Sequence, residues 1–165
     1  MPFSTMAMQS GGEQRRKQNG ALVPMTSIYK ITYSETNDRV CLYNWGCPFR
    51  CRGCSYQLRE VEGGEPNSYL SLEEIRSVLS DIEGLERVHF LGGDPSISPD
   101  LPDILQMCKQ EFGLITWLGH TNGTRLPLPN LDGANVGLKA YTPELHRDYT
   151  GYPRDPIYEN FTAAY

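Results

Sequence analysis

Long hydrophobic runs are missing from this sequence. No stretch of its 165 residues approaches the ~18 consecutive apolar residues that a membrane-spanning helix needs. The amino-terminal residues also lack the apolar stretch of a secretory signal. We therefore predict a cytoplasmic protein without a membrane partner.

An excess of positive charge is also missing. Lys and Arg number 15 against 20 Asp and Glu, which gives a formal net charge of −5. The only basic run, residues 15–17, lies among small polar residues and is interpreted as part of a solvated tail. Since nucleic-acid-binding proteins usually concentrate Lys and Arg on one surface, no nucleic-acid partner is predicted.

Cysteine is scarce, and its distribution argues against a disulfide framework. Of the five cysteines, three lie in the stretch CPFRCRGC, as Cys47, Cys51 and Cys54. Secreted disulfide frameworks usually have an even number of cysteines spread over the chain. A reducing compartment fits better, and there such a cluster usually means metal or redox chemistry. The other two, Cys41 and Cys108, are predicted to be small core residues.

Hydrophobic periodicity divides the chain into a tail and a core. Residues 1–24 show little periodicity and much Ser, Gly, Gln and Met, so a disordered tail is predicted before a core over residues 25–165. Within the core, strands are predicted on both sides of a turn at 36–38 and over 87–91, 114–119 and 135–141, with helices over 71–84 and 99–113 and a further helix from 155. Ser71 and Glu74 form a predicted capping box.

Strands that alternate with amphipathic helices at this spacing predict an α/β fold with a parallel sheet. Consecutive right-handed βα units curl into a barrel or an open arc, and functional groups gather at the carboxyl ends of the strands. We therefore expect one rim to carry the cysteine loop, the motifs GGDP (92–95) and HTNG (120–123), and the region of Lys139.

The number of clustered cysteines narrows the kind of metal site. A structural zinc site uses four closed ligands, and no fourth ligand stands in a recognisable pair here. A [4Fe–4S] cluster held by three cysteines leaves one iron open to a substrate or cofactor. Zinc, another metal and unliganded thiols remain alternatives at this point.

The spacing Cys47-x3-Cys51-x2-Cys54, after a strand and before βα repeats, resembles that of the radical S-adenosylmethionine (radical SAM) superfamily. The resemblance covers about residues 40–158 and implies an enzyme on a partial (β/α) barrel, here with about four βα units. It implies two cofactors, a [4Fe–4S] cluster on the three cysteines and S-adenosylmethionine on the open iron. In this family, reductive cleavage of S-adenosylmethionine yields methionine and a 5′-deoxyadenosyl radical, which abstracts hydrogen from the substrate.

The same resemblance assigns contacts to the methionine end of the cofactor. GGDP is similar to the family's GGEP motif, which implies that Gly92, Gly93 and Asp94 cradle that end. HTNG is similar to the next polar strand end, which implies cofactor contacts from Thr121 and Asn122. A simple Asn-Gly turn is the alternative for the last two residues.

Two further cofactor contacts are implied less directly. Lys139 corresponds to a lysine of the fourth strand, although Gly137 stands where activases of the pyruvate formate-lyase type usually have Asp. Gly53 stands before the third cysteine, where the superfamily often has an aromatic residue, so Tyr56 is predicted to supply that surface. No catalytic side chain is assigned.

The segment LKAYTPELHRDYTG, residues 138–151, resembles the one that follows the fourth strand in glycyl-radical-enzyme activases. Arg52-Gly53-Cys54 is similar to the Pro-Gly-Cys of anaerobic ribonucleotide reductase activases, which are also short and also favour GGDP. The predicted function is therefore activation of a partner protein by glycyl-radical formation. The implied partners are that glycyl-radical enzyme and a flavodoxin- or ferredoxin-type reductant. Alternatives are a small-molecule enzyme of the 7-deazaguanine type, a peptide-modifying maturase, and a non-catalytic metal or iron–sulfur binding module.

Overall fold

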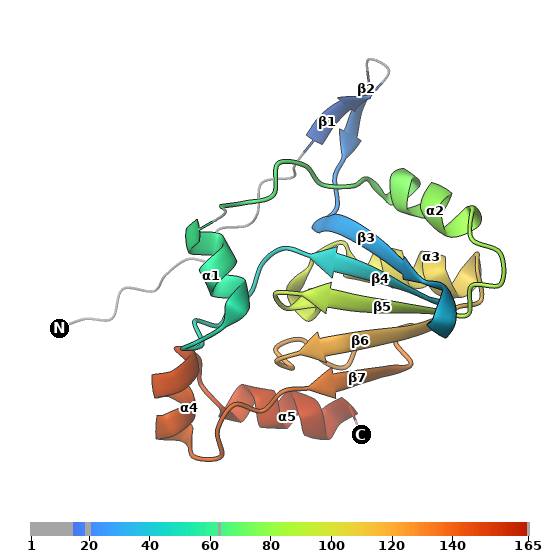
Figure 1. The fold of residues 1–165 in the computed structure, drawn as a ribbon. Helices are drawn as coiled ribbons and strands as arrows, with labels where there is room; N and C mark the ends of the chain where they lie inside the picture. The colour runs from blue at the N-terminus through green and yellow to red at the C-terminus, as the bar shows by residue number, and fades with distance from the viewer. Residues whose placement is uncertain (1–14, 19–20, 63, 165) are drawn as a thin grey trace.

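The computed structural model describes residues 15–18, 21–62 and 64–164 (Figure 1). Its centre is a five-stranded sheet in the order β3-β4-β5-β6-β7. The first pair is antiparallel and the remaining pairs are parallel, which confirms the α/β class and fits a partial radical SAM type barrel. The strands are β3 (Ile28–Ser34), β4 (Arg39–Asn44), β5 (Arg87–Gly92), β6 (Ile115–Thr121) and β7 (Gly133–Val136).

The turn between β3 and β4 lies where the sequence predicts it. A short 3-10 helix, η1 (Glu35–Asn37), fills the connection, and Asp38 follows with φ 44°. Asp is among the few residues that tolerate this left-handed backbone. The antiparallel pairing therefore follows from local turn chemistry.

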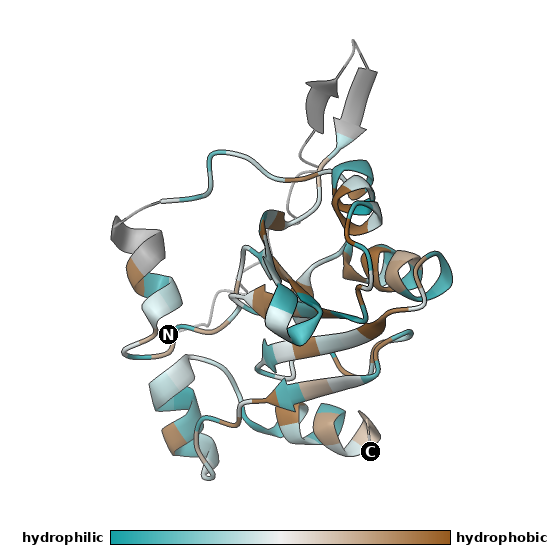
Figure 2. Cartoon of the chain, turned by 45° about the vertical axis from the view of Figure 1, so that its right-hand side comes forward, coloured by the Kyte–Doolittle hydropathy of each residue, from teal (hydrophilic) through white to brown (hydrophobic). Residues whose placement is uncertain are grey.

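Helices α2 (Leu72–Ser80) and α3 (Leu101–Gln110) pack on one face of the sheet. The predicted capping box at the start of α2 is confirmed: Ser71 Oγ accepts from the Glu74 amide (3.2 Å), and the Glu74 carboxylate accepts from the Ser71 amide (2.8 Å). Hydrophobic residues line the strands and the inner sides of both helices in Figure 2. The fully buried core includes Val40, Leu42, Val88, Phe90 and Leu118 from strands and Ile75, Ile104, Leu105 and Cys108 from helices.

The fourth parallel strand begins and ends earlier than the sequence analysis predicts. β7 spans Gly133–Val136, so Lys139 lies in the loop beyond the strand. Gly133 pairs with Trp117, and a Cβ atom at position 133 would lie 2.1 Å from the Trp117 ring. The missing side chain at Gly133 is therefore what allows this strand to approach its neighbour.

Of three more helices, two lie near the carboxyl ends of the strands and one lies beside the last strand. The sequence analysis did not predict α1 (Ser55–Glu62) and α4 (Pro143–Thr150), which lie near the arrowheads of the parallel strands in Figure 1. The start of α5 (Asp155–Ala164) is confirmed, and its buried Ile157 lies under β7 near Gly123. A further 3-10 helix, η2 (Pro95–Ile97), follows β5.

The predicted disordered tail is partly described. Within it, β1 (Arg15–Gln18) and β2 (Ala21–Pro24) pair as an antiparallel hairpin. Residues 1–14 and 19–20 lie outside the described residues. Among the described helices, none has the length and apolar character required to cross a membrane.

Candidate functional site

The cysteine loop leaves the carboxyl end of β4 and leads directly into α1. Two glycines with positive φ lie directly before the first and third cysteines, Gly46 at 108° and Gly53 at 73°. The Cys54 amide donates to the Cys51 carbonyl (3.3 Å), and the Leu58 amide then donates to the Cys54 carbonyl (3.2 Å). The loop therefore winds into the first turn of a helix, which sets the third cysteine at a helix start.

The three clustered thiols share one partly enclosed environment. All three are free and half-buried. Burial raises the pKa of Cys47 to about 11, and the nearby Asp94 carboxylate and the other two thiols act in the same direction. Burial also raises the pKa of Cys51, although the Lys139 ammonium opposes the shift. The three thiols therefore influence one another's charge, as neighbouring groups of one loop do.

The other two cysteines are core residues, as predicted. Cys41 is buried in β4 and Cys108 is fully buried in α3. Burial raises the pKa of Cys108 to about 12, so this thiol stays protonated.

The arrangement of the clustered thiols bears on the kind of metal that they fit. Within the described part of the chain, no three His, Cys, Asp or Glu side chains are arranged to hold a single metal ion. A structural zinc ion needs its ligands around one point. In an iron–sulfur cluster each thiolate binds a separate iron, so three thiols need not converge on a point. Three thiols on one short loop are the ligand type that an iron–sulfur cluster uses.

The end of β5 packs closely against the start of the cysteine loop. A Cβ atom at Gly92 would lie 2.1 Å from the Asn44 carbonyl oxygen, and one at Gly93 would lie 2.1 Å from the Gly46 carbonyl oxygen. The Gly93 and Asp94 amides donate to these two carbonyls at 3.3 and 2.8 Å. Both glycines are thus required for backbone packing, a reason that the motif resemblance did not supply.

Asp94 is a fully buried carboxylate at the centre of this rim. Its Oδ1 accepts from the hydroxyls of Thr121 (2.6 Å) and Ser96 (3.0 Å) and from the Ser96 amide (3.2 Å). Burial raises its pKa, and these hydrogen bonds, together with the Thr124 side chain, oppose the rise. Its Oδ2 is buried and has no hydrogen-bond partner among the described residues, which leaves one acceptor for a cationic or donor group.

The end of β6 reaches both Asp94 and the cysteine loop. Thr121 holds Asp94, and the next residue, Asn122, donates from Nδ2 to Cys47 Sγ (3.8 Å). The Asn122 Oδ1 accepts from the Thr124 amide (3.0 Å) and hydroxyl, which orients the side chain. The two predicted residues therefore lie at the site, and they connect β5, β6 and the first cysteine.

Lys139 and Tyr56 also lie at this end of the sheet. Lys139 Nζ donates to His120 Nε2 (3.4 Å), and a Cβ atom at Gly137 would lie 2.9 Å from this lysine nitrogen. The Tyr56 hydroxyl accepts from the Gly46 amide (2.6 Å), and its ring packs on Trp45 at 4.9 Å between centroids. Tyr56 therefore supports the base of the cysteine loop.

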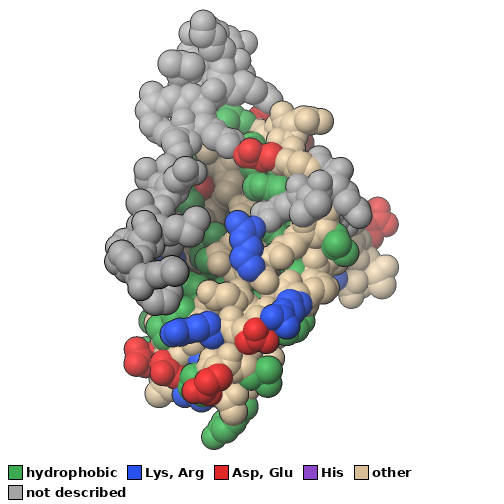
Figure 3. All heavy atoms as spheres, turned by 90° about the vertical axis from the view of Figure 1, so that its left-hand side faces the viewer, with side chains coloured by type: hydrophobic (Ala, Val, Ile, Leu, Met, Phe, Trp, Pro, Cys, Tyr) green, Lys and Arg blue, Asp and Glu red, His purple; other side chains and the backbone are tan. Residues whose placement is uncertain are grey.

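Sequence reasoning missed the contact between the cysteine loop and α4. The Arg52 guanidinium pairs with Asp148 (2.8 Å), and Phe49 is buried against residues near the end of α4. Figure 3 views the side on which α1 and α4 lie, where charged groups of both signs are interspersed. The Thr-Gly pair at 150–151, a helix-ending signal, is what could have indicated this helix.

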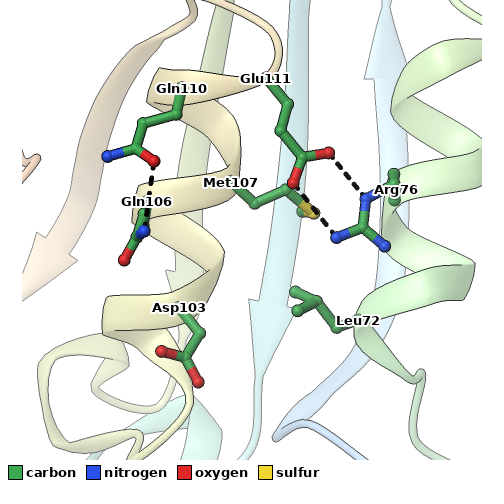
Figure 4. A pocket seen from close by; sticks show the side chains of 7 residues that line it. All are labelled: Leu72, Arg76, Asp103, Gln106, Met107, Gln110 and Glu111. Atoms are coloured by element: carbon green, nitrogen blue, oxygen red, sulfur yellow. Dashed lines mark hydrogen bonds and ion pairs between the residues drawn. The ribbon is translucent and has the colours of Figure 1, made fainter.

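Two hollows lie away from this rim. One of about 230 Å³ lies between α2 and α3, where Arg76 Nε bonds to Glu111 Oε2 at 2.8 Å (Figure 4). Its lining is Leu72, Arg76, Asp103, Gln106, Met107, Gln110 and Glu111. Another of about 290 Å³ lies beside β7. Neither is lined by a clustered cysteine.

Comparison with known proteins gives a family and a set of relatives. The model of the Radical SAM superfamily matches residues 45–165. GTP 3',8-cyclase of Pectobacterium atrosepticum is 34% identical over 96 residues, which are 57% of this chain and 29% of that protein. The enzyme of the same name from Vibrio cholerae is 30% identical over 117 residues, 66% of this chain and 35% of that protein. That from Stenotrophomonas maltophilia is 31% identical over 126 residues, 71% of this chain and 38% of that protein. The chain thus spans about a third of the length of these relatives.

These relatives correct the partner prediction. A glycyl-radical enzyme as protein substrate, with a flavodoxin- or ferredoxin-type reductant, is wrong, because the relatives are named for a reaction on GTP, a small molecule. The more specific resemblance to glycyl-radical activases is unsupported for the same reason. The segment at 138–151 that suggested it forms α4 and the loop before it.

Proposed function

We propose, because the chain belongs to the radical SAM superfamily, that Cys47, Cys51 and Cys54 hold a [4Fe–4S] cluster. Membership implies this cluster and S-adenosylmethionine as cofactors and places the chain in a class of enzymes. The reduced cluster, when bound, supplies the electron that splits S-adenosylmethionine into methionine and a radical that takes hydrogen from the substrate. We further propose that the radical SAM core extends over residues 25–165.

One observation carries this proposal: three half-buried thiols and the buried Asp94 carboxylate meet at the carboxyl ends of parallel strands. Functional groups of open α/β sheets gather at this edge. The Asn122 amide beside Cys47 Sγ donates toward sulfur and stabilises a thiolate there. The rim therefore offers sulfur ligands and a pre-oriented donor beside the first of them.

The remaining rim residues are proposed to bind S-adenosylmethionine. Asp94, with one free oxygen, suits the ammonium of the methionine moiety, and Lys139 suits its carboxylate. Gly92 and Gly93 allow the backbone before Asp94 to pack closely on the cysteine loop. Tyr56 keeps the start of that loop in place. Thr121 orients Asp94 by a hydrogen bond, and Asn122 directs its amide N–H at Cys47.

We propose that the substrate is a small molecule of the purine nucleotide class. The support is the name of the relatives, GTP 3',8-cyclase, which match up to 71% of this chain in the three cases above. This reading replaces activation of a protein, and it agrees with the small-molecule alternative of the sequence analysis.

The first experiment tests the cluster and the cleavage. The protein is reconstituted anaerobically with iron and sulfide, reduced with dithionite and given S-adenosylmethionine, and 5′-deoxyadenosine is measured by chromatography. We expect product from the wild type and from the core variant Cys41→Ala, and none from Cys51→Ala. Cleavage that persists in Cys51→Ala would refute the cluster assignment.

A second experiment tests the substrate class. GTP deuterated throughout its ribose is added to the same assay, with equally deuterated ATP as the matched control. We expect deuterium in 5′-deoxyadenosine from GTP and little or none from ATP. If cleavage proceeds but neither nucleotide transfers deuterium, the substrate proposal fails and the cleavage proposal stands.

A further inference from the structure

Phe49 lies between two of the clustered cysteines, yet its side chain is only 2% exposed. Its ring stacks on Tyr152, with centroids 5.0 Å apart and planes at 29°. The ring of His146 meets it edge to face at 5.6 Å and 87°. A loop residue thus forms a small aromatic core with a segment that follows much later in the chain.

Main-chain hydrogen bonds join the same two segments. The Arg50 amide donates to the Thr150 carbonyl (2.7 Å), and the Arg52 amide donates to the Tyr149 carbonyl (3.1 Å). These two amides flank Cys51 on either side. The end of α4 therefore fixes the backbone on both sides of the second cysteine.

His146 holds the end of α4 in the shape that these bonds require. It is 1% exposed, and its Nδ1 donates to the Tyr152 carbonyl (2.9 Å). The Thr150 hydroxyl donates to the His146 carbonyl (2.7 Å), and Gly151 ends the helix at φ 73°. The side chain thus closes the turn that presents the Tyr149 and Thr150 carbonyls to the cysteine loop.

The contacts of the ring fix its tautomer. Its Nε2 is buried and has no hydrogen-bond partner among the described residues. An N–H at Nε2 would be buried without an acceptor, which is costly. The Nδ1–H tautomer is the form in which the one available acceptor is used.

We propose that His146 is a positioning residue for the cysteine loop, acting through the turn at Thr150–Tyr152 and through Phe49. The proposal rests on the proposed role of the three cysteines as cluster ligands. A ligand loop that is held on one side by α1 and on the other by α4 keeps its sulfur atoms at the spacing that a cluster needs. The α1 side is provided by Gln57, whose Nε2 donates to the Phe49 carbonyl (2.9 Å).

The test uses two amide variants that differ in reach. In His146→Asn the side-chain nitrogen can take the place of Nδ1. In His146→Gln it reaches the place of Nε2 and leaves the Tyr152 carbonyl with only the longer contact from the Thr150 hydroxyl (3.2 Å). Hydrogen exchange of the Arg50 and Arg52 amides is followed by NMR in the apoprotein. We expect exchange about tenfold faster in His146→Gln, as for the loss of one hydrogen bond, and near wild type in His146→Asn.

The second readout is the cluster itself, in the reconstituted protein. We expect His146→Gln to lose iron to a chelator about tenfold faster than the wild type and to shift the electron paramagnetic resonance spectrum of the reduced cluster. His146→Asn should restore both. Equal exchange in the two variants, or faster exchange with unchanged iron loss and spectrum, would overturn the proposal.

A third variant covers the case in which position 146 tolerates no change. Thr150→Val removes the hydroxyl and keeps the shape of the side chain, and the same two readouts apply to it with the same expected direction. The exchange measurement needs no cluster, so it stands if the cysteines prove to bind none. Failure of the cluster assignment is read separately, from Cys51→Ala.

Discussion

Two regions of the same strands differ sharply in what they bury. Along β4, β5 and β6, the helix-covered face buries apolar side chains such as Leu42, Phe90 and Leu118 completely. At the carboxyl ends, the buried side chains are polar, and they include Asn44, Asp94, Thr121 and Asn122. The transition takes place within two to four residues of each strand.

This difference separates what holds the fold from what the site requires. The core is stabilised by removing apolar surface from water. The rim instead buries polar atoms, and Asp94 Oδ2 and Asn44 Oδ1 have no partner among the described residues. Such atoms cost stability unless another group binds them. The comparison therefore predicts that changes in the core cost mainly stability and that changes at the rim cost mainly function.

The largest expected effect comes from exchanging a thiol in each region. Cys54→Ala, at the rim, should abolish cluster formation and S-adenosylmethionine cleavage while leaving the apoprotein about as stable as the wild type, because Cys54 is half-buried. Cys108→Ala, in the core, should keep both activities and cost about 1–2 kcal/mol of unfolding free energy. Iron content, product chromatography and urea unfolding measure the two effects. The same loss of iron in both variants would abolish the distinction.

The next effect is on stability alone. Phe90→Ala removes a fully buried ring from the centre of β5 and should lower the free energy of unfolding by about 3–5 kcal/mol in urea. Protein that remains folded at low temperature should still bind iron at the wild-type ratio. Loss of iron from folded Phe90→Ala protein would show that core and rim are not separable.

A smaller effect is expected where the regions meet. In Gly92→Ala the new methyl group would meet the Asn44 carbonyl oxygen at 2.1 Å, and the residue would keep an unfavourable φ of 115°. We expect a loss of about 2–4 kcal/mol, from backbone strain and overpacking together. Gly84→Ala is the matched control, since Gly84 has φ 70° and nothing within 4 Å of the new atom. It should cost only about 1 kcal/mol, and equal losses would mean that close packing at the rim contributes nothing.

The two regions also differ in how far the sequence could predict them. The periodicity of apolar residues correctly predicted α3 and β5, because their buried residues are hydrophobic. It could not predict α4, whose buried residues are His146 and Thr150. It also misplaced β7, where Gly133 pairs closely under Trp117. Elements that bury polar or small residues carry no hydrophobic signal.

The candidate site divides in the same way. Spacing within one segment was enough to single out Cys47, Cys51 and Cys54. The bond from Asn122 to Cys47 and the docking of Phe49 on α4 join segments far apart in the chain. Such contacts depend on strand order and register, which no local pattern contains.

The smallest expected effect is on stability and comes from Asp132, which precedes β7 at the opposite end of the strands. Burial alone would raise its pKa, but hydrogen bonds from Lys109 and Thr116 outweigh this and hold the pKa below its ordinary value of 3.8. A carboxyl with a lowered pKa in the folded state stabilises the protein above its unfolded pKa, and the contribution is lost as the pH falls through the folded pKa. The side chain is 37% exposed, so solvent screening limits the contribution to less than about 1 kcal/mol.

Asp132→Asn should therefore be slightly less stable than the wild type at pH 7, and the two should converge as the pH falls below 3.8. Urea unfolding of both proteins between pH 7 and pH 3 measures this difference. A difference that persists at low pH would mean that Asp132 stabilises the start of β7 by shape and neutral hydrogen bonds to Thr116. Because this residue lies away from the rim, iron binding should stay unchanged in the variant, and the test then separates an electrostatic contribution to the fold from any contribution to the site.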